Sequence, residues 1–286
     1  MTQTICLNNS NVSDYWQLLK PRVMSLVVFT GLCGMLAAPG KIHPLIGFTA
    51  ILSLAIGAGA AGCLNMWWEK DSDALMRRTA NRPLPAGRID PNTALAFGVI
   101  MASAAVLTMV VAVNLVAAFL LAFTIFYYVV IYTALLKPRT PQNIVIGGAA
   151  GALPPVIGWA AVTGNAPIEA WALFLIIFLW TPAHFWALSL HCSDDYKKAG
   201  IPMLPCVKGH DATKRQIFLY TFLTVVSSYL PYYFHIAHDL YLGVAAVLGI
   251  GFLGLSIAVC YWGKNPLNLF SYSIFYLFFL FLALVV

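Results

Sequence analysis

Residues 93–136 form a run of 44 amino acids without one charged side chain. A transmembrane helix needs about 17–25 apolar residues, so this run is too long for a single crossing. We divide it at Asn114 into two spans. The whole chain is 61% hydrophobic and only 9% charged, whereas soluble domains carry about 25% charged residues. The lipid bilayer is therefore the expected solvent.

The other apolar runs are also continuous and long, which predicts an all-α, polytopic bundle in a single domain over residues 1–286. A transmembrane β-barrel would instead show alternating segments of about ten residues. The best count is nine spans, with eight and ten as the alternatives, and the nine are expected at 22–39, 45–68, 93–113, 115–136, 143–163, 169–190, 216–236, 241–262 and 267–286.

The basic residues predict the orientation of this bundle. Of the 16 Lys and Arg residues, the nine-span arrangement places only Lys41 on the side opposite the N-terminus. Cytoplasmic loops carry an excess of Lys and Arg, so the N-terminus is expected in the cytoplasm. The same rule explains the net charge of +6. Together with the hydropathy, it excludes nucleic acid as a partner.

Two long loops, at 69–92 and 191–215, lie on the predicted cytoplasmic side. Each begins with acidic residues and continues through basic ones, and the second loop comes four spans after the first. Such a recurrence is typical of an internal repeat. We therefore expect two related four-helix halves and one additional span.

The first loop starts with a regular series of oxygen-bearing side chains. Asn65, Glu69 and Asp73 are four residues apart and share one face if the second span continues as a helix. Asp71 adds a third carboxylate. Like charges at this spacing repel one another, and Mg²⁺ would neutralise them, because it binds carboxylates together with substrate phosphates.

Asp194 and Asp195 form a second acidic cluster on the same membrane side. Two clusters around one cavity could hold Mg²⁺ ions that bridge a diphosphate. Basic side chains, which match phosphate oxygens, interleave with the acids. The alternative is a surface loop whose charges neutralise one another and follow membrane topology. The candidate diphosphate-binding residues are Arg77, Arg78, Arg82, Lys137, Arg139, Lys197 and Lys198.

Four separate motifs resemble one family. The series from Asn65 to Asp73, followed by MRRTANRPL (76–84), resembles the first aspartate-rich motif of the UbiA-type intramembrane prenyltransferases. Three more stretches look like the haem O synthase branch of that family: LLKPRTPQNIVIGGAAGALPP (135–155), TPAHFWALSL (181–190) and DDYKKAGIPMLP (194–205). Met66 stands where the wider family usually has Asp, and the two aspartates of the second cluster are adjacent. Both departures fit the haem branch.

The resemblance implies transfer of a farnesyl group from farnesyl diphosphate to the vinyl group of haem b, which gives haem O. Mg²⁺ would be the cofactor and haem b a substrate, in a bacterial inner membrane with the active site facing the cytoplasm. Assembly proteins of the haem pathway or of terminal oxidases would be further partners. The residues expected to carry catalysis are Asn65, Glu69, Asp73 and Asp195.

If haem is the substrate, two histidines and nearby aromatic residues are candidates for the haem pocket. His184 lies inside the sixth span and His191 lies two turns further along the same face. An imidazole in a membrane indicates function, and haem iron ligation, water capture or a packing role all remain open. Trp186 and its aromatic neighbours could shield an allylic cation or simply face lipid.

Two other functions fit parts of the pattern. Another UbiA-type enzyme would prenylate a different aromatic acceptor, such as a quinone precursor, but the haem-type motifs argue against it. A secondary transporter with an internal repeat would place its charged groups near the bilayer midplane, whereas these acids lie at the ends of spans.

Overall fold

The computed structural model describes residues 10–286, and every regular element in that range is a helix. The elements are α1 Val12–Leu18, α2 Pro21–Ala37, α3 Pro44–Trp68, α4 Lys70–Ala74, α5 Pro91–Ala112, α6 Leu115–Phe126, the π-helix η1 Tyr127–Leu136, α7 Asn143–Ala152, α8 Pro154–Thr163, α9 Ile168–His191, α10 Ser193–Lys198, α11 Leu204–Lys208, α12 His210–Ser227, α13 Leu230–Tyr233, α14 Asp239–Tyr261 and α15 Pro266–Ala283.

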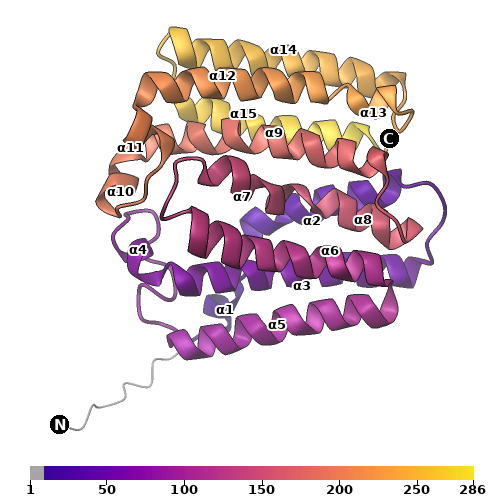
Figure 1. Cartoon of the computed structure of the whole chain (residues 1–286), viewed down its shortest axis with the longest axis horizontal. Helices are drawn as coiled ribbons and strands as arrows, with labels where there is room; N and C mark the ends of the chain where they lie inside the picture. Colours follow the sequence, from indigo (N-terminus) through magenta and orange to yellow (C-terminus); the bar gives the residue numbers. More distant parts are fainter. Residues whose placement is uncertain (1–9) are drawn as a thin grey trace.

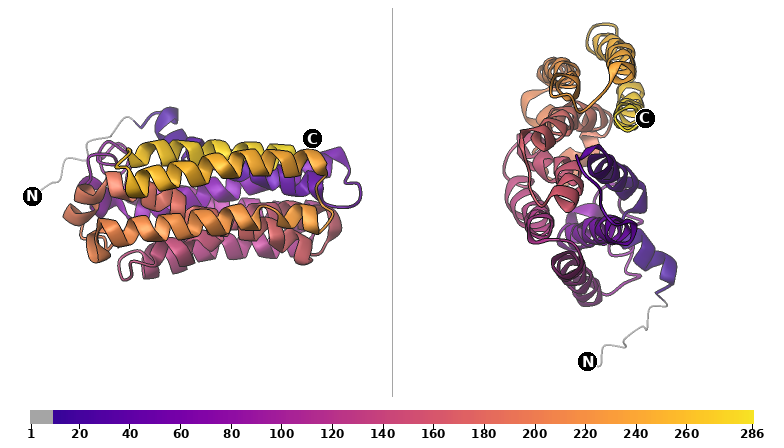
Figure 2. Two further views of the ribbon diagram at one scale, coloured as in Figure 1. Left: turned by 90° about the horizontal axis from the view of Figure 1, so that it is seen from above. Right: turned by 90° about the vertical axis from the view of Figure 1, so that its right-hand side faces the viewer.

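The long helices run side by side along the longest axis of the molecule (Figure 1). Contacts between neighbours form a closed series, which proceeds from α2 through α3, α5, α6, η1, α7, α9, α12 and α14 to α15 and returns to α2. Stacking of Phe29 on Phe278, with ring centroids 4.5 Å apart, joins the first and last of these helices. Helix α8 packs against α2, α6 and α9. The end view shows this curved arrangement (Figure 2).

The expected spans agree closely with the helices. Within the described range, seven helices or continuous helix pairs are long and apolar enough to cross a membrane, and the α1–α2 pair, bent by 53°, is an eighth candidate. The seventh expected span, at 216–236, has no counterpart among these candidates, because α12 begins at His210, ends at Ser227 and contains Asp211, Lys214 and Arg215. The expected start after Arg215 comes too late, because Lys and Arg near a helix end can extend their charged groups toward water and still belong to the helix.

The predicted break at Asn114 in the longest apolar run is confirmed, and the structure has a further break between α7 and α8. Asn114 separates α5 from α6, and its side chain caps α6 by accepting a hydrogen bond from the Ala117 N–H. Pro154 begins α8 after a break at Leu153. A side chain on Gly34 would collide with the Pro155 backbone, so this glycine permits the close packing of α2 on α8.

The two loops that carry the sequence motifs meet at one end of the bundle. The first contains α4 and the second contains α10 and α11, and all three short helices lie at the left end in Figure 1. Helix η1 also ends there. Its ten residues have π-helical hydrogen bonding, which is rare and frequently marks a functional site.

Candidate active site

The end of α3 presents three oxygen-bearing side chains inside the protein. Asn65 lies in the last turn of α3, Glu69 caps its C-terminus and Asp73 follows in α4. The Glu69 N–H bonds to the Asn65 carbonyl at 3.0 Å, and the Asp73 N–H to the Glu69 carbonyl at 2.8 Å. This four-residue pattern keeps the three side chains on one face, as the sequence predicted. All three are at least 93% buried.

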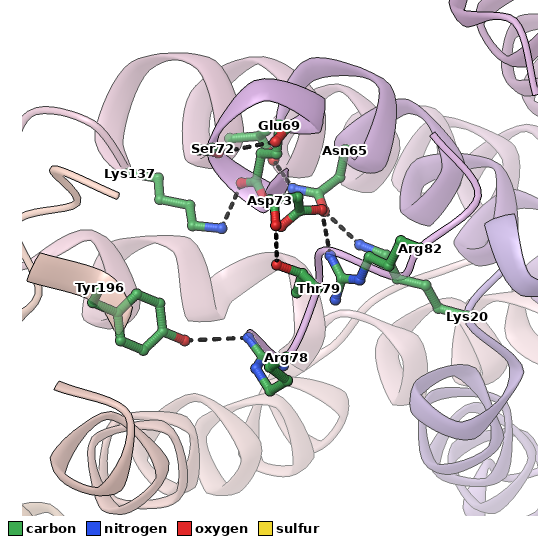
Figure 3. Close-up of polar contacts among 11 residues, drawn as sticks. Lys20, Asn65, Glu69, Ser72, Asp73, Arg78, Thr79, Arg82, Lys137 and Tyr196 are labelled. Carbon is green, nitrogen blue, oxygen red and sulfur yellow. Dashed lines mark hydrogen bonds and ion pairs between the residues drawn. The ribbon is translucent and has the colours of Figure 1, made fainter. Parts of the chain in front are cut away.

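Each of these three side chains is paired through an oxygen atom with a cation from a different part of the chain (Figure 3). The Lys20 Nζ donates to Asn65 Oδ1 at 2.5 Å. The Lys137 Nζ lies 2.6 Å from Glu69 Oε1, and the Arg82 Nη1 lies 2.6 Å from Asp73 Oδ2. Lys20 precedes α2, Lys137 follows η1, and Arg82 comes from the loop after α4. The site therefore joins three separate segments.

Burial sets the electrostatics of this network. Burial raises the pKa of Glu69, but the ammonium groups of Lys137 and Lys20 outweigh it, so the pKa lies below its usual value. Burial also lowers the pKa of Lys137, yet the Glu69 carboxylate holds it above its usual value. Lys20 differs, since burial and the nearby Arg82 lower its pKa to about 7. The Glu69–Lys137 pair is thus fully ionised near neutral pH.

The donor set fits a hard divalent cation. Two carboxylates and one amide oxygen are the type of ligand that Mg²⁺ prefers. Asp73 Oδ1 is buried and has no hydrogen-bond partner within the described residues. A buried carboxylate oxygen without a partner is costly, and a bound cation would satisfy it. Asn65, Glu69 and Asp73 would hold Mg²⁺ here.

The second acidic cluster is arranged differently from the first. Asp194 is exposed and Asp195 half-buried, both in the short helix α10. Across the range that the structure covers, no three acidic, histidine or cysteine side chains converge to hold a metal. Lys197 and Lys198 are also exposed. The structure therefore does not gather the second cluster and the first into one acidic site, and the metal role of Asp194 and Asp195 stays a prediction.

One contact does connect the two loops. Tyr196 of α10 is 1% exposed, and its hydroxyl accepts a hydrogen bond from Arg78 Nη2 at 3.5 Å (Figure 3). Three other predicted residues lie at the periphery. The Asp71 side chain is 88% exposed and pairs with the adjacent Lys70, Arg77 is exposed, and the guanidinium of the exposed Arg139 donates to the carbonyl of Leu135.

His184 is held tightly within the bundle. Its ring stacks between Trp180 and Phe270, with centroid distances of 4.2 and 4.5 Å. Ser273 Oγ donates its proton to the Phe270 carbonyl at 2.6 Å, so it accepts from His184 Nδ1–H, also at 2.6 Å. This proton count leaves Nε2 as the ring nitrogen with a free lone pair. A histidine that binds metal is often fixed in this way through its other nitrogen.

The remaining candidates for the haem pocket lie in different environments. Trp186 is fully buried against Tyr220, and its Nε1 has no hydrogen-bond partner in the part of the chain described. His191 is exposed at the C-terminus of α9. Although the two histidines are seven residues apart, only His184 faces other helices of the bundle.

Sequence reasoning missed three residues of this site. In the sequence Lys20 is only one of the basic residues that indicate the orientation, and in the structure it is also the one non-glycine residue of this site in the left-handed region, at φ 51°. Thr133 receives a hydrogen bond from Asn65 Nδ2 at 2.9 Å. Tyr196 contacts Arg78. The position of Lys20 directly before Pro21 was the one available signal, because that lysine must lie where the first span begins.

The fold and this buried charged network define a helical membrane protein with an internal polar site at one end. The UbiA prenyltransferase family model matches residues 26–284. The chain therefore belongs to the UbiA prenyltransferase family, which confirms the resemblance found in the motifs, and it is a membrane-embedded prenyl-transferring enzyme.

Curated relatives and solved structures agree with this assignment. The chain is 58% identical to a protoheme IX farnesyltransferase of Parvibaculum lavamentivorans, over 96% of this chain and 88% of the relative. It is 55% identical to a protoheme IX farnesyltransferase of Rhizobium johnstonii, over 98% and 90%. A UbiA homologue of Archaeoglobus fulgidus solved with GPP and Mg²⁺ has a TM-score of 0.69 at 16% identity and covers 95% of this chain and 99% of its own. A structure of digeranylgeranylglyceryl phosphate synthase has a TM-score of 0.75 at 18% identity and covers 96% and 98%.

Proposed function

We propose that the chain transfers a farnesyl group from farnesyl diphosphate to a vinyl group of haem b and releases haem O and diphosphate. The buried network around Glu69 and Asp73 is the structural observation that carries this proposal. Relatives more than 50% identical bear the name of this activity. We further propose that residues 1–286 act as one catalytic domain.

In the proposed reaction the farnesyl C1–oxygen bond and the vinyl π bond break, and one carbon–carbon bond and one carbon–oxygen bond form. The bond between farnesyl C1 and the diphosphate oxygen breaks, and C1 forms a carbon–carbon bond with the terminal vinyl carbon. The positive charge then lies on the vinyl carbon next to the porphyrin, where water adds and loses a proton. Haem b, farnesyl diphosphate and water thus become haem O and diphosphate.

The chain's basic residues would stabilise the leaving diphosphate. Lys20, Arg82 and Lys137 enter the site from three segments, and their charged groups lie within hydrogen-bond distance of the oxygen donors. Preplaced cations lower a barrier without reorganising in the transition state. Mg²⁺ held by Asn65, Glu69 and Asp73 would supply further positive charge at the diphosphate. We propose supporting roles for Arg77, Arg78, Arg139, Lys197 and Lys198.

We propose that the second loop completes the site when substrate is present. Asp195 lies in α10, and Tyr196 next to it is anchored to Arg78 of the first loop. A diphosphate would attract the exposed Lys197 and Lys198 toward Arg78. Order induced by a ligand is a common way to exclude water from a reactive intermediate.

We propose that His184 acts on the haem side through Nε2. Ser273 and two aromatic rings hold the His184 ring in one orientation, so the position of its Nε2 is also fixed. It would either ligate the iron or accept the proton of the water that adds to the vinyl group. His191 and Trp186 would border the same pocket.

The orientation is also part of this proposal. We place the N-terminus and the site on the cytoplasmic side of a bacterial inner membrane, because the loops around the site carry most of the basic residues. Haem-pathway or terminal-oxidase assembly proteins would receive the product.

Membranes that contain the chain test the activity. Incubation with haem b, farnesyl diphosphate and Mg²⁺ should give a more hydrophobic haem, whose mass exceeds that of haem b by one farnesyl group and one hydroxyl. Liquid chromatography with mass spectrometry detects it, and membranes that contain a Glu69→Gln, Asp73→Asn double variant are the control. Prenylation of a quinone precursor in place of haem would contradict the proposed acceptor.

A spectrum tests the role of His184. Purified protein loaded with haem should show a histidine-type Soret band and EPR signal if Nε2 ligates iron, and His184→Phe should remove it. His235→Asn is the matched control, because His235 is exposed and its φ of 57° suits Asn. An unchanged spectrum with lost activity would assign His184 to water capture, and retained activity would leave it a packing residue.

A further inference from the structure

Thr133 is an uncharged residue of η1 that meets the active site across the bundle. It is 2% exposed, and 68 positions separate it from Asn65, whose Nδ2 donates to its Oγ1 at 2.9 Å. Asn65 is the only one of the three proposed Mg²⁺ ligands whose two terminal atoms differ. Only its oxygen can bind the cation, so the direction of its amide decides whether the site is complete.

Proton counting fixes that direction. The Thr133 hydroxyl donates its single proton to the Tyr128 carbonyl at 2.8 Å. Its oxygen can then only accept, so the amide nitrogen of Asn65 must face it. On the opposite side Lys20 Nζ donates to Asn65 Oδ1 at 2.5 Å, and in its protonated form this group can only donate. Both neighbours therefore require the same amide orientation, with the oxygen toward the charged site.

The π-helical register of η1 enables this arrangement. Thr124 of the preceding α-helical segment bonds through its hydroxyl to Leu120, four residues earlier, as threonines in α-helices commonly do. Thr133 instead bonds to Tyr128, five residues earlier, and the Lys137 N–H likewise bonds to Tyr132, five residues earlier. The same π-helical segment thus supplies the partner of Asn65 and ends at the partner of Glu69.

We infer that Thr133 is a positioning residue, whose hydroxyl, anchored on the Tyr128 carbonyl of the π-helix, holds the Asn65 amide with its oxygen toward the proposed Mg²⁺ site. This inference rests on the proposed function, because it needs Asn65 to bind the cation. Thr133 itself touches neither metal nor substrate.

Three variants test whether the Thr133 hydroxyl contributes to metal binding. Thr133→Val keeps the shape of the side chain and removes the oxygen, whereas Thr133→Ser keeps the oxygen. Thr124→Val removes a hydroxyl from the same long helix but leaves Asn65 untouched. The readout is the dissociation constant for Mn²⁺, used as a paramagnetic substitute for Mg²⁺, from EPR of the free ion in detergent-purified protein with inorganic diphosphate. The midpoint of thermal unfolding shows that each variant is folded.

We expect Thr133→Val to weaken Mn²⁺ binding roughly five- to tenfold, the effect of one lost orienting hydrogen bond. Thr133→Ser should stay within about twofold of the parent, as should Thr124→Val. In turnover assays Thr133→Val should raise the Mg²⁺ concentration needed for half-maximal rate and largely retain kcat at saturation. A purely structural role would lower kcat and leave that concentration unchanged.

The outcomes separate this inference from the proposed function. If the parent protein binds no Mn²⁺, the metal site and the role of Thr133 both fail. If the parent binds Mn²⁺ and Thr133→Val binds it equally well, only the role of Thr133 fails. If Thr133→Val does not fold, Thr133→Ala and Thr133→Ser still decide, since only the serine should retain the parent affinity.

Discussion

The two motif-bearing loops differ sharply in how their charges are compensated. The four ion pairs found in the described residues all involve residues of the first loop, and two of them, Arg82–Asp73 and Lys137–Glu69, are buried or nearly so. None involves residues 191–215. The first loop is therefore a preassembled half of the site, whereas the second is an open half whose acids and bases are exposed or half-buried. The difference indicates a division of labour between a rigid cation-binding half and a half that responds to substrate.

The largest expected effect follows from the burial of Asp73. Asp73→Asn should reduce the rate of haem prenylation at least about 100-fold, because it removes the charge that pairs with Arg82 and a proposed metal ligand. Asp71→Asn, at the exposed end of the same loop, should change the rate less than about threefold. Product formation over time measures both. Equal losses would show that position in the loop, and not burial, decides the role of these carboxylates.

The second-largest expected difference between the two halves is in how much a lost carboxylate lowers the stability of the protein. Glu69→Gln leaves the Lys137 ammonium buried without its counter-charge, which should cost roughly 2 kcal/mol of unfolding free energy. Asp195→Asn removes a half-buried carboxylate that forms no ion pair within residues 10–286, so its unfolding midpoint should stay close to that of the parent while its activity falls. Thermal unfolding in detergent tests this. A similar loss of stability in Asp195→Asn would mean that the second half is preassembled too.

Substrate affinity gives a finer comparison. Lys20→Met should raise the KM for farnesyl diphosphate about tenfold, since a buried charge-assisted hydrogen bond contributes about 1.5 kcal/mol or more. Lys197→Met should raise it only about threefold, as expected for an exposed charge. Steady-state kinetics at fixed haem provide both values. A larger effect at Lys197 would reverse the proposed order of the two halves.

The sequence predicted most of this architecture because burial in lipid leaves a strong signal. Eight of the nine expected spans start within about two residues of a helix in the structure. The four-residue spacing of Asn65, Glu69 and Asp73 keeps their side chains on one face beyond the end of α3. Lys20 and Thr133 could not be found in this way. Their roles depend on contacts with Asn65 across 45 and 68 positions, and a lone threonine in an apolar run usually bonds only to its own helix. No pattern among the residues of η1 indicates its π-helical hydrogen bonding.

The smallest expected effect concerns the anchor that holds the first loop in place. The Arg88 Nε donates to Asp14 Oδ1 at 2.7 Å, and Arg88 Nη2 also donates to the Asn81 carbonyl at 3.0 Å, so α1 is tied to the end of the loop. The hydrogen bond from Arg88 holds the pKa of Asp14 below its usual value of 3.8. A carboxylate with a lowered folded-state pKa stabilises the fold above its unfolded-state pKa and loses that contribution as the pH falls through the folded-state value.

The parent should therefore be more stable than Asp14→Asn near neutral pH, and this difference should shrink below about pH 4. Unfolding midpoints of both proteins across this range measure it, with Asp211→Asn in the second loop as the control that should show no such trend. A stability difference that persists at low pH would mean that Asp14 acts through the hydrogen bond that its Oδ2 accepts from the Asn11 N–H at the start of α1, and not through its charge.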